Sequence, residues 1–337
     1  MAEPLKIGVL GLGNIGKIHA RNIKYKIKNA ELVLLCDEKK DVVDPIATEL
    51  NIKKIYYNCK DAIWDKDADA FVIALPTHLK KDIILEASKA GKHLFIEKPI
   101  ALDLDQARII IDAINRSGIK ALVGYQRRYD RAFIKARELI TGGKLGRIQY
   151  IRSWTRDPPW QPSGWAADPK TSGGRPIDSS SHDIDIIRYL TNLEIVEVYA
   201  EGSNIIYDIF KRTGDYDHII VSLRLSNDAI GIIEYIGYTV YGYDVGVEVI
   251  GTAGRLSISM GTNSPISYSI GKSYEYDNPM NYGERFSDAY LNELINFINM
   301  IKYGEKPLIT LEDAYKALQI SLAIWKSLRE RRPVEIQ

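Results

Sequence analysis

Short apolar runs alternate with stretches of helical periodicity over the first third of the chain. The apolar runs predict buried strands at residues 6–10, 31–36, 70–74, 93–96 and 121–124. The segments between them predict helices over residues 15–27, 45–50, 81–90 and 104–117. Strands that are apolar throughout and alternate with helices are typical of a parallel sheet covered on both faces. We therefore expect residues 1–122 to form a doubly wound α/β domain of the Rossmann type.

The pattern changes after about residue 123. A helix predicted over 129–140 ends at Gly142 and Gly143, as helices do where a residue must take positive φ. Alternation of apolar and polar positions then predicts strands with one buried face, at 148–154, 195–202, 218–225, 230–236, 245–251 and 255–259. Amphipathic helices follow over 287–303 and 311–331, with Thr310 as N-cap of the second. We expect residues 123–337 to form an α+β domain with a large, open, mostly antiparallel sheet.

One stretch, residues 157–176, has almost no periodicity and is rich in proline and tryptophan. We interpret it as a loop between the sheet and a helix that begins near Ser181. Long ordered loops of this kind often carry function.

Composition fits an ordinary globular protein and narrows the possible partners. The 337 residues correspond to about two domains, and 45% of them are apolar. Lys and Arg number 45 against 44 Asp and Glu, so the balance gives no reason to expect nucleic acid or an anionic membrane as partner. Cys36 and Cys59 have no metal-binding spacing and are expected to be core thiols in a reducing compartment. With no apolar stretch of ~20 residues, we expect a cytoplasmic protein.

A glycine-rich segment joins the first predicted strand to the first helix. Its sequence, Gly11-Leu12-Gly13-Asn14-Ile15-Gly16, has the G-x-G-x-x-G spacing of dinucleotide-binding folds. In such folds the first glycine allows a tight turn, the second lets backbone approach a pyrophosphate, and the third allows close helix packing. The start of the helix then offers unpaired N–H groups to the anion. The segment predicts a dinucleotide cofactor.

An acidic residue at the end of the second predicted strand favours NAD over NADP. Asp37 follows Gly16 by 21 residues, where a carboxylate can bind a ribose 2′-hydroxyl and would repel a 2′-phosphate. Lys39 and Lys40 follow at once and keep NADP open as the less favoured alternative. The predicted cofactor contacts are Gly11, Gly13, Asn14, Ile15, Gly16, Asp37, Ala74, Pro76, Thr77, Glu97 and Lys98.

The predicted strand at 93–96 is followed by Glu97, Lys98 and Pro99. Ligands of open α/β sheets bind at the carboxyl ends of the strands. Because Pro99 disfavours helical geometry at the residue before it, we expect Lys98 to be extended and able to project into a cleft.

Together with the glycine segment and the later group Asp178, His182 and Asp183, the Glu97-Lys98-Pro99 motif resembles the family of glucose-fructose oxidoreductases and inositol dehydrogenases. The resemblance covers essentially the whole chain. It implies an N-terminal dinucleotide-binding domain and a C-terminal α/β domain with an open sheet, used for substrate binding and assembly into a dimer or tetramer.

Several segments are most similar to the inositol 2-dehydrogenase branch of that family: 124–130, 156–158, 241–244 and 285–290. By this resemblance the catalytic group is Lys98, Asp178 and His182. The residues near the polyol are then Arg127, Asp157, Tyr290 and either Tyr241 or Tyr243, with Tyr241 as our choice. Two departures concern the substrate: Lys80 stands where many relatives have histidine, and the Trp-containing stretch 160–169 is longer than the branch pattern.

The chemistry of these side chains agrees with an alcohol oxidation. Hydride must leave carbon for the nicotinamide while a base removes the hydroxyl proton, and histidine titrates near neutrality, so His182 is the natural base. Asp178 precedes it by four residues and shares its face if the turn is helical, where it can orient the imidazole. Lys98 would stabilise alkoxide character.

Other interpretations remain open. The substrate could be an aldose or deoxy-sugar instead of myo-inositol, or the protein could be a non-catalytic, NAD-bound sugar sensor. A redox-neutral hydrolase that oxidises transiently is a third alternative. Asp183 and Asp185 are expected to be first-turn helix acids. Asp178, His182 and Asp185 have no further ligand at suitable spacing, so we expect no metal.

Overall fold

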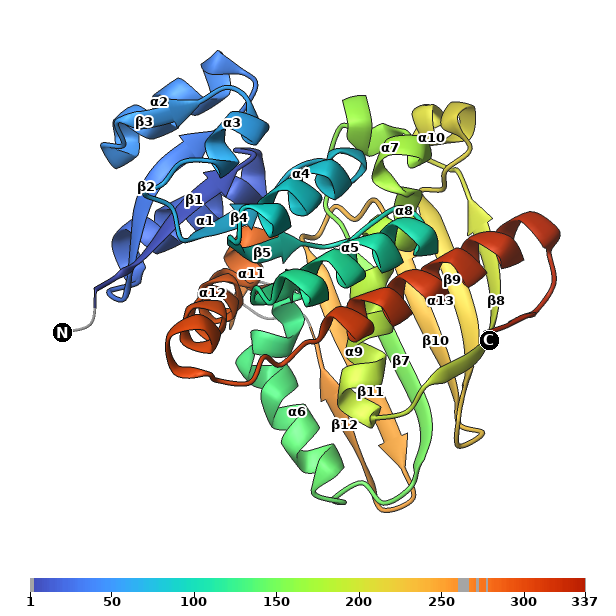
Figure 1. Cartoon of the computed structure of the whole chain (residues 1–337). Coiled ribbons are helices and arrows are strands. Elements are labelled where there is room, and N and C mark those ends of the chain that lie inside the picture. Colours follow the sequence, from blue (N-terminus) through green and yellow to red (C-terminus); the bar gives the residue numbers. More distant parts are fainter. Residues whose placement is uncertain (1–2, 260–266, 271–272, 277, 337) are drawn as a thin grey trace. The chain divides into compact units, whose positions relative to one another are not determined.

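The computed structural model describes residues 3–259, 267–270, 273–276 and 278–336 (Figure 1). The chain forms two compact units. The first consists of Met1–Tyr129 and Asp288–Leu318, and the second of Asp130–Ser287 and Gln319–Gln337. Each unit is thus built from two separate segments of the chain, and the boundary predicted at 122/123 remains a prediction.

The first unit contains a six-stranded parallel sheet in the order β3-β2-β1-β4-β5-β6. The strands are β1 (Leu5–Leu10), β2 (Ala30–Cys36), β3 (Lys54–Tyr56), β4 (Ala70–Ile73), β5 (His93–Glu97) and β6 (Ala121–Gly124). The inner strands are almost entirely buried, as expected for a parallel sheet with helices on both faces. This confirms the predicted doubly wound fold.

Helices of the first unit come from both of its segments. Those of the N-terminal segment are α1 (Asn14–Lys26), α2 (Lys40–Leu50), α3 (Cys59–Ile63), α4 (Thr77–Lys89), α5 (Leu104–Ser117) and the short η1 (Gln126–Tyr129). From the second segment, α12 (Ser287–Tyr303) packs Phe297 against Phe95 of β5, with ring centroids 5.9 Å apart. The following helix, α13 (Leu311–Glu330), belongs to this unit only as far as Leu318. It begins with the expected cap, since the Thr310 hydroxyl accepts a hydrogen bond from the Asp313 N–H.

Two predicted helix starts in this unit were wrong. Helix α2 begins at Lys40 and contains Pro45, whereas the sequence suggested that the proline opened the helix. Helix α4 begins at Thr77, four residues before the predicted start, directly after Pro76. Strand β3 and helix α3 were not predicted, because elements of three and five residues are too short to show a hydrophobic period.

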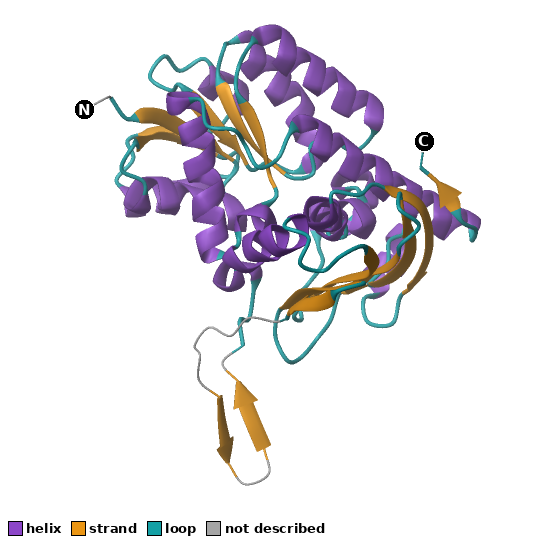
Figure 2. Ribbon diagram, turned by 90° about the horizontal axis from the view of Figure 1, so that it is seen from below, coloured by secondary structure: helices purple, strands orange, loops and turns teal. Residues whose placement is uncertain are grey.

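The second unit is built around a seven-stranded sheet in the order β12-β11-β7-β10-β9-β8-β15, which curves strongly in Figure 2. The strands are β7 (Ile148–Arg156), β8 (Ile195–Ser203), β9 (His218–Leu225), β10 (Ile230–Ile236), β11 (Asp244–Gly251), β12 (Gly254–Ile258) and β15 (Val334–Glu335). Strands β7 and β10 pair parallel, and the other pairs of this sheet are antiparallel. The predicted open, mostly antiparallel sheet is confirmed.

The stretch predicted as a loop contains three short helices: η2 (Gly164–Ala167), α7 (Pro169–Ser172) and α8 (Gly174–Asp178). Trp160 packs against Tyr207 and Phe210, with ring centroids 6.1 and 6.0 Å away. The remaining elements of the unit are α6 (Arg131–Thr141), α9 (Ser181–Thr191), α10 (Asp208–Thr213), β13 (Ser267–Ile270), β14 (Ser273–Tyr276) and α11 (Tyr282–Arg285). Within the part of the chain that the structure describes, no helix has the length and apolarity needed to cross a membrane.

Helix α9 is anchored to the sheet by a buried carboxylate. Asp183 lies in the first turn of α9, as predicted, and is fully buried. Its two oxygens accept hydrogen bonds from Ser153 Oγ and Thr155 Oγ1 of β7, both at 2.6 Å. These bonds fix the start of the helix that carries His182.

We expect Asp183→Asn to destabilise the protein by about 3 kcal/mol, because one of the two buried hydroxyls loses its charged acceptor. Urea denaturation measures the loss. Asp208→Asn, an exposed acid in the first turn of α10, is the matched control and should change the free energy of unfolding by less than about 0.5 kcal/mol. Equal effects of the two substitutions would contradict an anchoring role for Asp183.

Candidate active site

The glycine segment has the geometry that a dinucleotide requires. Gly11 takes φ +87°, and a Cβ there would lie 2.5 Å from the Ala74 carbonyl oxygen. A Cβ on Gly16 would lie 2.0 Å from the Gly11 oxygen, so only glycine lets α1 approach β1 this closely. A Cβ on Gly13, by contrast, would meet nothing within 4 Å, which leaves the backbone open to a pyrophosphate at the start of α1. Helix α1 has no side-chain N-cap that would compete with the anion.

Asp37 lies beside this segment, directly after β2. Its Oδ2 accepts a hydrogen bond from the Leu12 N–H at 2.8 Å, and its Oδ1 accepts one from the Lys39 N–H at 3.0 Å. These bonds fix the carboxylate at the carboxyl edge of the sheet, where a ribose hydroxyl can donate to it. The ammonium group of Lys40 lies over the Tyr57 ring, 4.9 Å from its centroid. The residues present therefore fit NAD.

The other predicted cofactor contacts lie along the same edge of the parallel sheet. Asn14 and Ile15 open α1, Ala74 and Pro76 connect β4 to α4, and Thr77 opens α4. Glu97 is the last residue of β5, and Lys98 follows it. Because carboxyl ends of parallel strands meet at one edge, these positions share it.

A buried lysine holds the turn that carries Lys98. Lys80 of α4 is only 1% exposed. Its Nζ donates hydrogen bonds to the carbonyl oxygens of Glu97, Lys98 and Pro99, at 2.6, 3.1 and 3.0 Å. By sequence, Lys80 stands out only as a departure from relatives. Its spacing does indicate burial, since Lys80 precedes the buried Ile83 and Ile84 by three and four residues and so shares their helix face.

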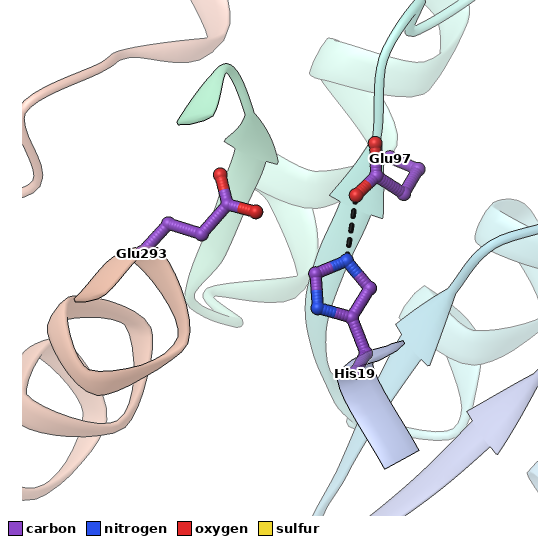
Figure 3. A group of neighbouring side chains, drawn as sticks. All are labelled: His19, Glu97 and Glu293. Atoms are coloured by element: carbon purple, nitrogen blue, oxygen red, sulfur yellow. Dashed lines mark hydrogen bonds and ion pairs between the residues drawn. The ribbon is translucent and has the colours of Figure 1, made fainter. Parts of the chain in front are cut away.

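The side chain of Glu97 points to a buried acid–base cluster (Figure 3). His19 Nε2 of α1 lies 2.6 Å from Glu97 Oε1, and Glu293 of α12 completes the group, with all three ligand atoms within 4.8 Å of one another. Within the described ranges, neither oxygen of Glu293 has a hydrogen-bond partner, and the side chain is fully buried. Burial, and then the charge of Glu97, raises the pKa of Glu293 well above 4.5.

The cluster of His19, Glu97 and Glu293 offers one imidazole nitrogen and two carboxylates, donors that suit a divalent metal. No sequence pattern points to this group, because its members are far apart along the chain. Because its pKa is raised, Glu293 keeps a proton, and the remaining carboxylate of the group, that of Glu97, is hydrogen-bonded to His19.

Two further predicted residues, Asp157 and Asp178, belong to a polar cluster in the second unit. Arg175, which is 3% exposed, lies with Nη2 3.1 Å from Asp178 Oδ2, and its guanidinium stacks 5.3 Å from the Trp160 ring centroid. The Tyr235 hydroxyl donates a hydrogen bond to Asp157 Oδ2 at 3.1 Å. Arg175 and Tyr235 were missed by the sequence analysis, because no local pattern shows which strand residue meets which helix.

Charge and burial act together in this cluster. Burial, and then the charge of Asp157, raises the pKa of Tyr235 well above 10, so its hydroxyl keeps its proton and donates. The charge of Arg175 and its hydrogen bond partly oppose this rise in the pKa of Tyr235. Burial by itself would lower the pKa of Arg175, and the charges of Asp178 and Asp215 offset that effect. Asp157 and Asp178 are therefore held by buried partners whose protonation states are fixed at neutral pH.

His182 is the second residue of α9 and is partly exposed. Helix α8 ends at Asp178 and α9 begins at Ser181, so Asp178 and His182 do not lie on one continuous helix. Ser179 and Ser180 nevertheless have right-handed helical backbone, and the His182 N–H donates to the Ser179 carbonyl at 3.3 Å. The turn between Asp178 and His182 is therefore helical, which is the condition for their two side chains to share one face.

The predicted substrate residues differ in exposure. Arg127 and Tyr290 of the first unit are buried, at 1% and 6% exposure, and the Tyr290 ring meets the His19 ring edge-on. Tyr241 of the second unit is 45% exposed, and its hydroxyl accepts a hydrogen bond from Arg156 Nη1 at 3.4 Å. Tyr243 is buried and packs against Phe286. Their substrate roles remain predictions.

Fold and cofactor site together define an NAD-binding oxidoreductase. Residues 5–125 match the family model described as "Oxidoreductase family, NAD-binding Rossmann fold", and residues 137–336 match the model for the C-terminal alpha/beta domain of the same oxidoreductase family. The chain belongs to the glucose-fructose oxidoreductase and inositol dehydrogenase family, and the predicted resemblance is confirmed.

Relatives match the chain over its full length. It is 33% identical to the myo-inositol 2-dehydrogenase of Thermotoga maritima, with 99% of each chain covered. It is 32% identical to the scyllo-inositol 2-dehydrogenase (NAD(+)) of Bacillus subtilis, covering 100% of this chain and 97% of that protein. The crystal structure of scyllo-inositol dehydrogenase from Lactobacillus casei with bound NAD(H) and scyllo-inositol has a TM-score of 0.92 at 32% identity, with 99% of each chain covered.

We expect Glu293→Gln to change how stability depends on pH. The unfolded chain releases the Glu293 proton near pH 4.5 while the folded protein retains it, so this group's contribution is complete at low pH and is lost as pH rises. Urea denaturation at pH 5 and pH 8 measures the free energy of unfolding of both proteins. Relative to the unmodified protein, the value for the variant should rise by up to ~1.4 kcal/mol per pH unit. Glu312→Gln, at an exposed position of α13, is the control. Parallel profiles for E293Q and the unmodified protein would contradict the neutral acid.

Asp37→Asn should weaken the preference for NAD over NADP by about tenfold, because it removes the charge that repels a 2′-phosphate while keeping an oxygen for the Leu12 N–H. Dissociation constants of both cofactors, measured by calorimetry, give the ratio. Glu38→Gln removes a charge from the exposed neighbouring position and should leave the ratio unchanged. An unchanged ratio in D37N would exclude Asp37 as the selective group.

Proposed function

We propose that this protein oxidises a secondary hydroxyl of a cyclic polyol and reduces NAD, with myo-inositol as the substrate and 2-keto-inositol as the product. The observation that carries the proposal is the position of Lys98. It follows β5 at the same sheet edge as the glycine segment, on a turn held by Lys80. The names of the relatives support an inositol as the substrate class.

In the proposed mechanism, the residues of this chain handle the proton and the oxygen. NAD, when bound, supplies the acceptor for the hydride. The neutral imidazole of His182 takes the hydroxyl proton, a contribution of ~10² to 10⁴-fold in rate. Asp178, held by Arg175, orients that imidazole, and the Lys98 ammonium donates a hydrogen bond to the oxygen as it gains alkoxide character.

Polyol recognition is assigned to the side chains that offer hydrogen bonds to several hydroxyls: Arg127, Asp157, Tyr241 and Tyr290. The Asp157 carboxylate accepts a bond from Tyr235, and an ionised carboxylate can accept several hydrogen bonds at once. Relatives are named for both myo- and scyllo-inositol, so family membership does not determine the isomer. The choice of myo-inositol is our proposal.

The competing function is the oxidation of another sugar, an aldose or deoxy-sugar, with the same Lys98 and His182. Initial rates with NAD and a panel of myo-inositol, scyllo-inositol and aldoses, followed by absorbance of reduced nicotinamide, separate the two. We expect the highest kcat/KM with myo-inositol. An aldose at the top of the ranking would replace the polyol assignment, and NAD binding without reduction by any member would favour a sugar sensor.

His182→Ala is expected to lower kcat by ~10²-fold or more, because the base is lost, and to leave the NAD dissociation constant within about twofold. Stopped-flow absorbance measures the first and calorimetry the second. His78→Ala, at an exposed position of α4, serves as the control and should retain full activity. Normal turnover in H182A would remove this histidine from the mechanism.

A further inference from the structure

The chain has two cysteines, and the fold brings them together. Cys36 is the last residue of β2 and Cys59 the first residue of α3. Their Sγ atoms lie 3.3 Å apart and share a hydrogen bond. By sequence they are expected to be core thiols without metal-binding spacing, 23 positions apart along the chain. Because helix α3 packs on β2, the two cysteines are neighbours in space.

The two sulfurs differ in accessibility. Cys36 is fully buried, whereas Cys59 is partly exposed. The hydrogen bond with Cys59, and then burial, raises the pKa of Cys36, so this thiol keeps its proton in the reduced protein. A dissolved reagent therefore reaches Cys59 first, and Cys36 is in place behind it as the second sulfur.

We propose that Cys36 and Cys59 are a reversible dithiol–disulfide pair, oxidised by thiol–disulfide exchange with a small-molecule disulfide. In the first step the Cys59 thiolate attacks one sulfur of the small disulfide, forms a mixed disulfide and releases one small thiolate. In the second step Cys36 loses its proton and attacks the Cys59 sulfur, which releases the second small thiolate. The two protein thiols are oxidised, the small disulfide is reduced to two thiols, and the two protein protons pass to these products.

The bond would close a loop over residues 36–59, which contains α2 and β3. A crosslink of this kind stabilises a protein mainly by restricting its unfolded chain. The loop begins one residue before Asp37, whose carboxylate is already fixed by two backbone N–H groups. We therefore assign the pair a stabilising role in the nucleotide-binding fold, independent of the substrate proposed above.

The test is a titration of the full-length protein with oxidised glutathione, followed by intact mass and by thiol counting in denaturant. The unmodified protein should lose two hydrogen atoms in mass and both reactive thiols, and dithiothreitol should restore them. C36S should stop at a single glutathione adduct on Cys59. C59S should stay unmodified, because Cys36 is buried.

The melting temperature supplies a second readout. Oxidation should raise the Tm of the unmodified protein by about 5 °C, and the double variant C36S/C59S should show no difference between the two conditions. A stable glutathione adduct on the unmodified protein, or no reaction at all, would overturn the pair. A bond that forms without raising the Tm would overturn its stabilising role.

Discussion

The ammonium group of Lys80 is the interaction on which the proposed chemistry of the first unit depends. A buried ammonium must replace its lost hydration, and here three successive carbonyl oxygens do so, those of Glu97, Lys98 and Pro99. The same bonds satisfy hydrogen-bonding capacity of three backbone carbonyl groups. Because donor and acceptors need one another, the backbone around Lys98 is fixed before any ligand arrives. The buried Lys80 side chain thereby sets the position of the backbone from which the partly exposed Lys98 side chain extends.

Buried charge is balanced in a different way in each unit. In the first, Glu97 is bonded to His19, and the nearby Glu293 is neutralised by a proton, because burial and then the charge of Glu97 raise its pKa. In the second, Arg175 offsets two carboxylates, Asp178 and the fully buried Asp215. Burial still raises the pKa of Asp215 in spite of that guanidinium, which shows how costly desolvation is there. In both units the buried charges are thus compensated by neighbouring side chains, next to residues proposed for function.

The sequence predicted those parts of the structure that depend on a repeated local pattern. The bounds of α5, β6, β9, β10 and α12 agree with the prediction, since apolar runs or apolar periods determine them. Asp37 was predicted from its place at the end of a strand, 21 residues after Gly16. By contrast, the short helices at 164–178 have no full period, and Lys80 and His19 bind partners that lie 17 or more positions away in the chain. Periodicity says which face of an element is buried, but it does not say which other element covers that face.

Exposure distinguishes two tyrosines between which the family resemblance does not choose. Tyr241 and Tyr243 are two residues apart, and either could serve as the polyol tyrosine by sequence. Tyr243 is 5% exposed and packs against Phe286, so its ring is part of the core. Tyr241 is 45% exposed, and its hydroxyl lies at long hydrogen-bond distances of 3.4 Å from Arg156 and 3.5 Å from Asp244. We therefore keep Tyr241 as the proposed polyol tyrosine, because its hydroxyl can exchange these long bonds for bonds to a dissolved polyol without disturbing packed side chains.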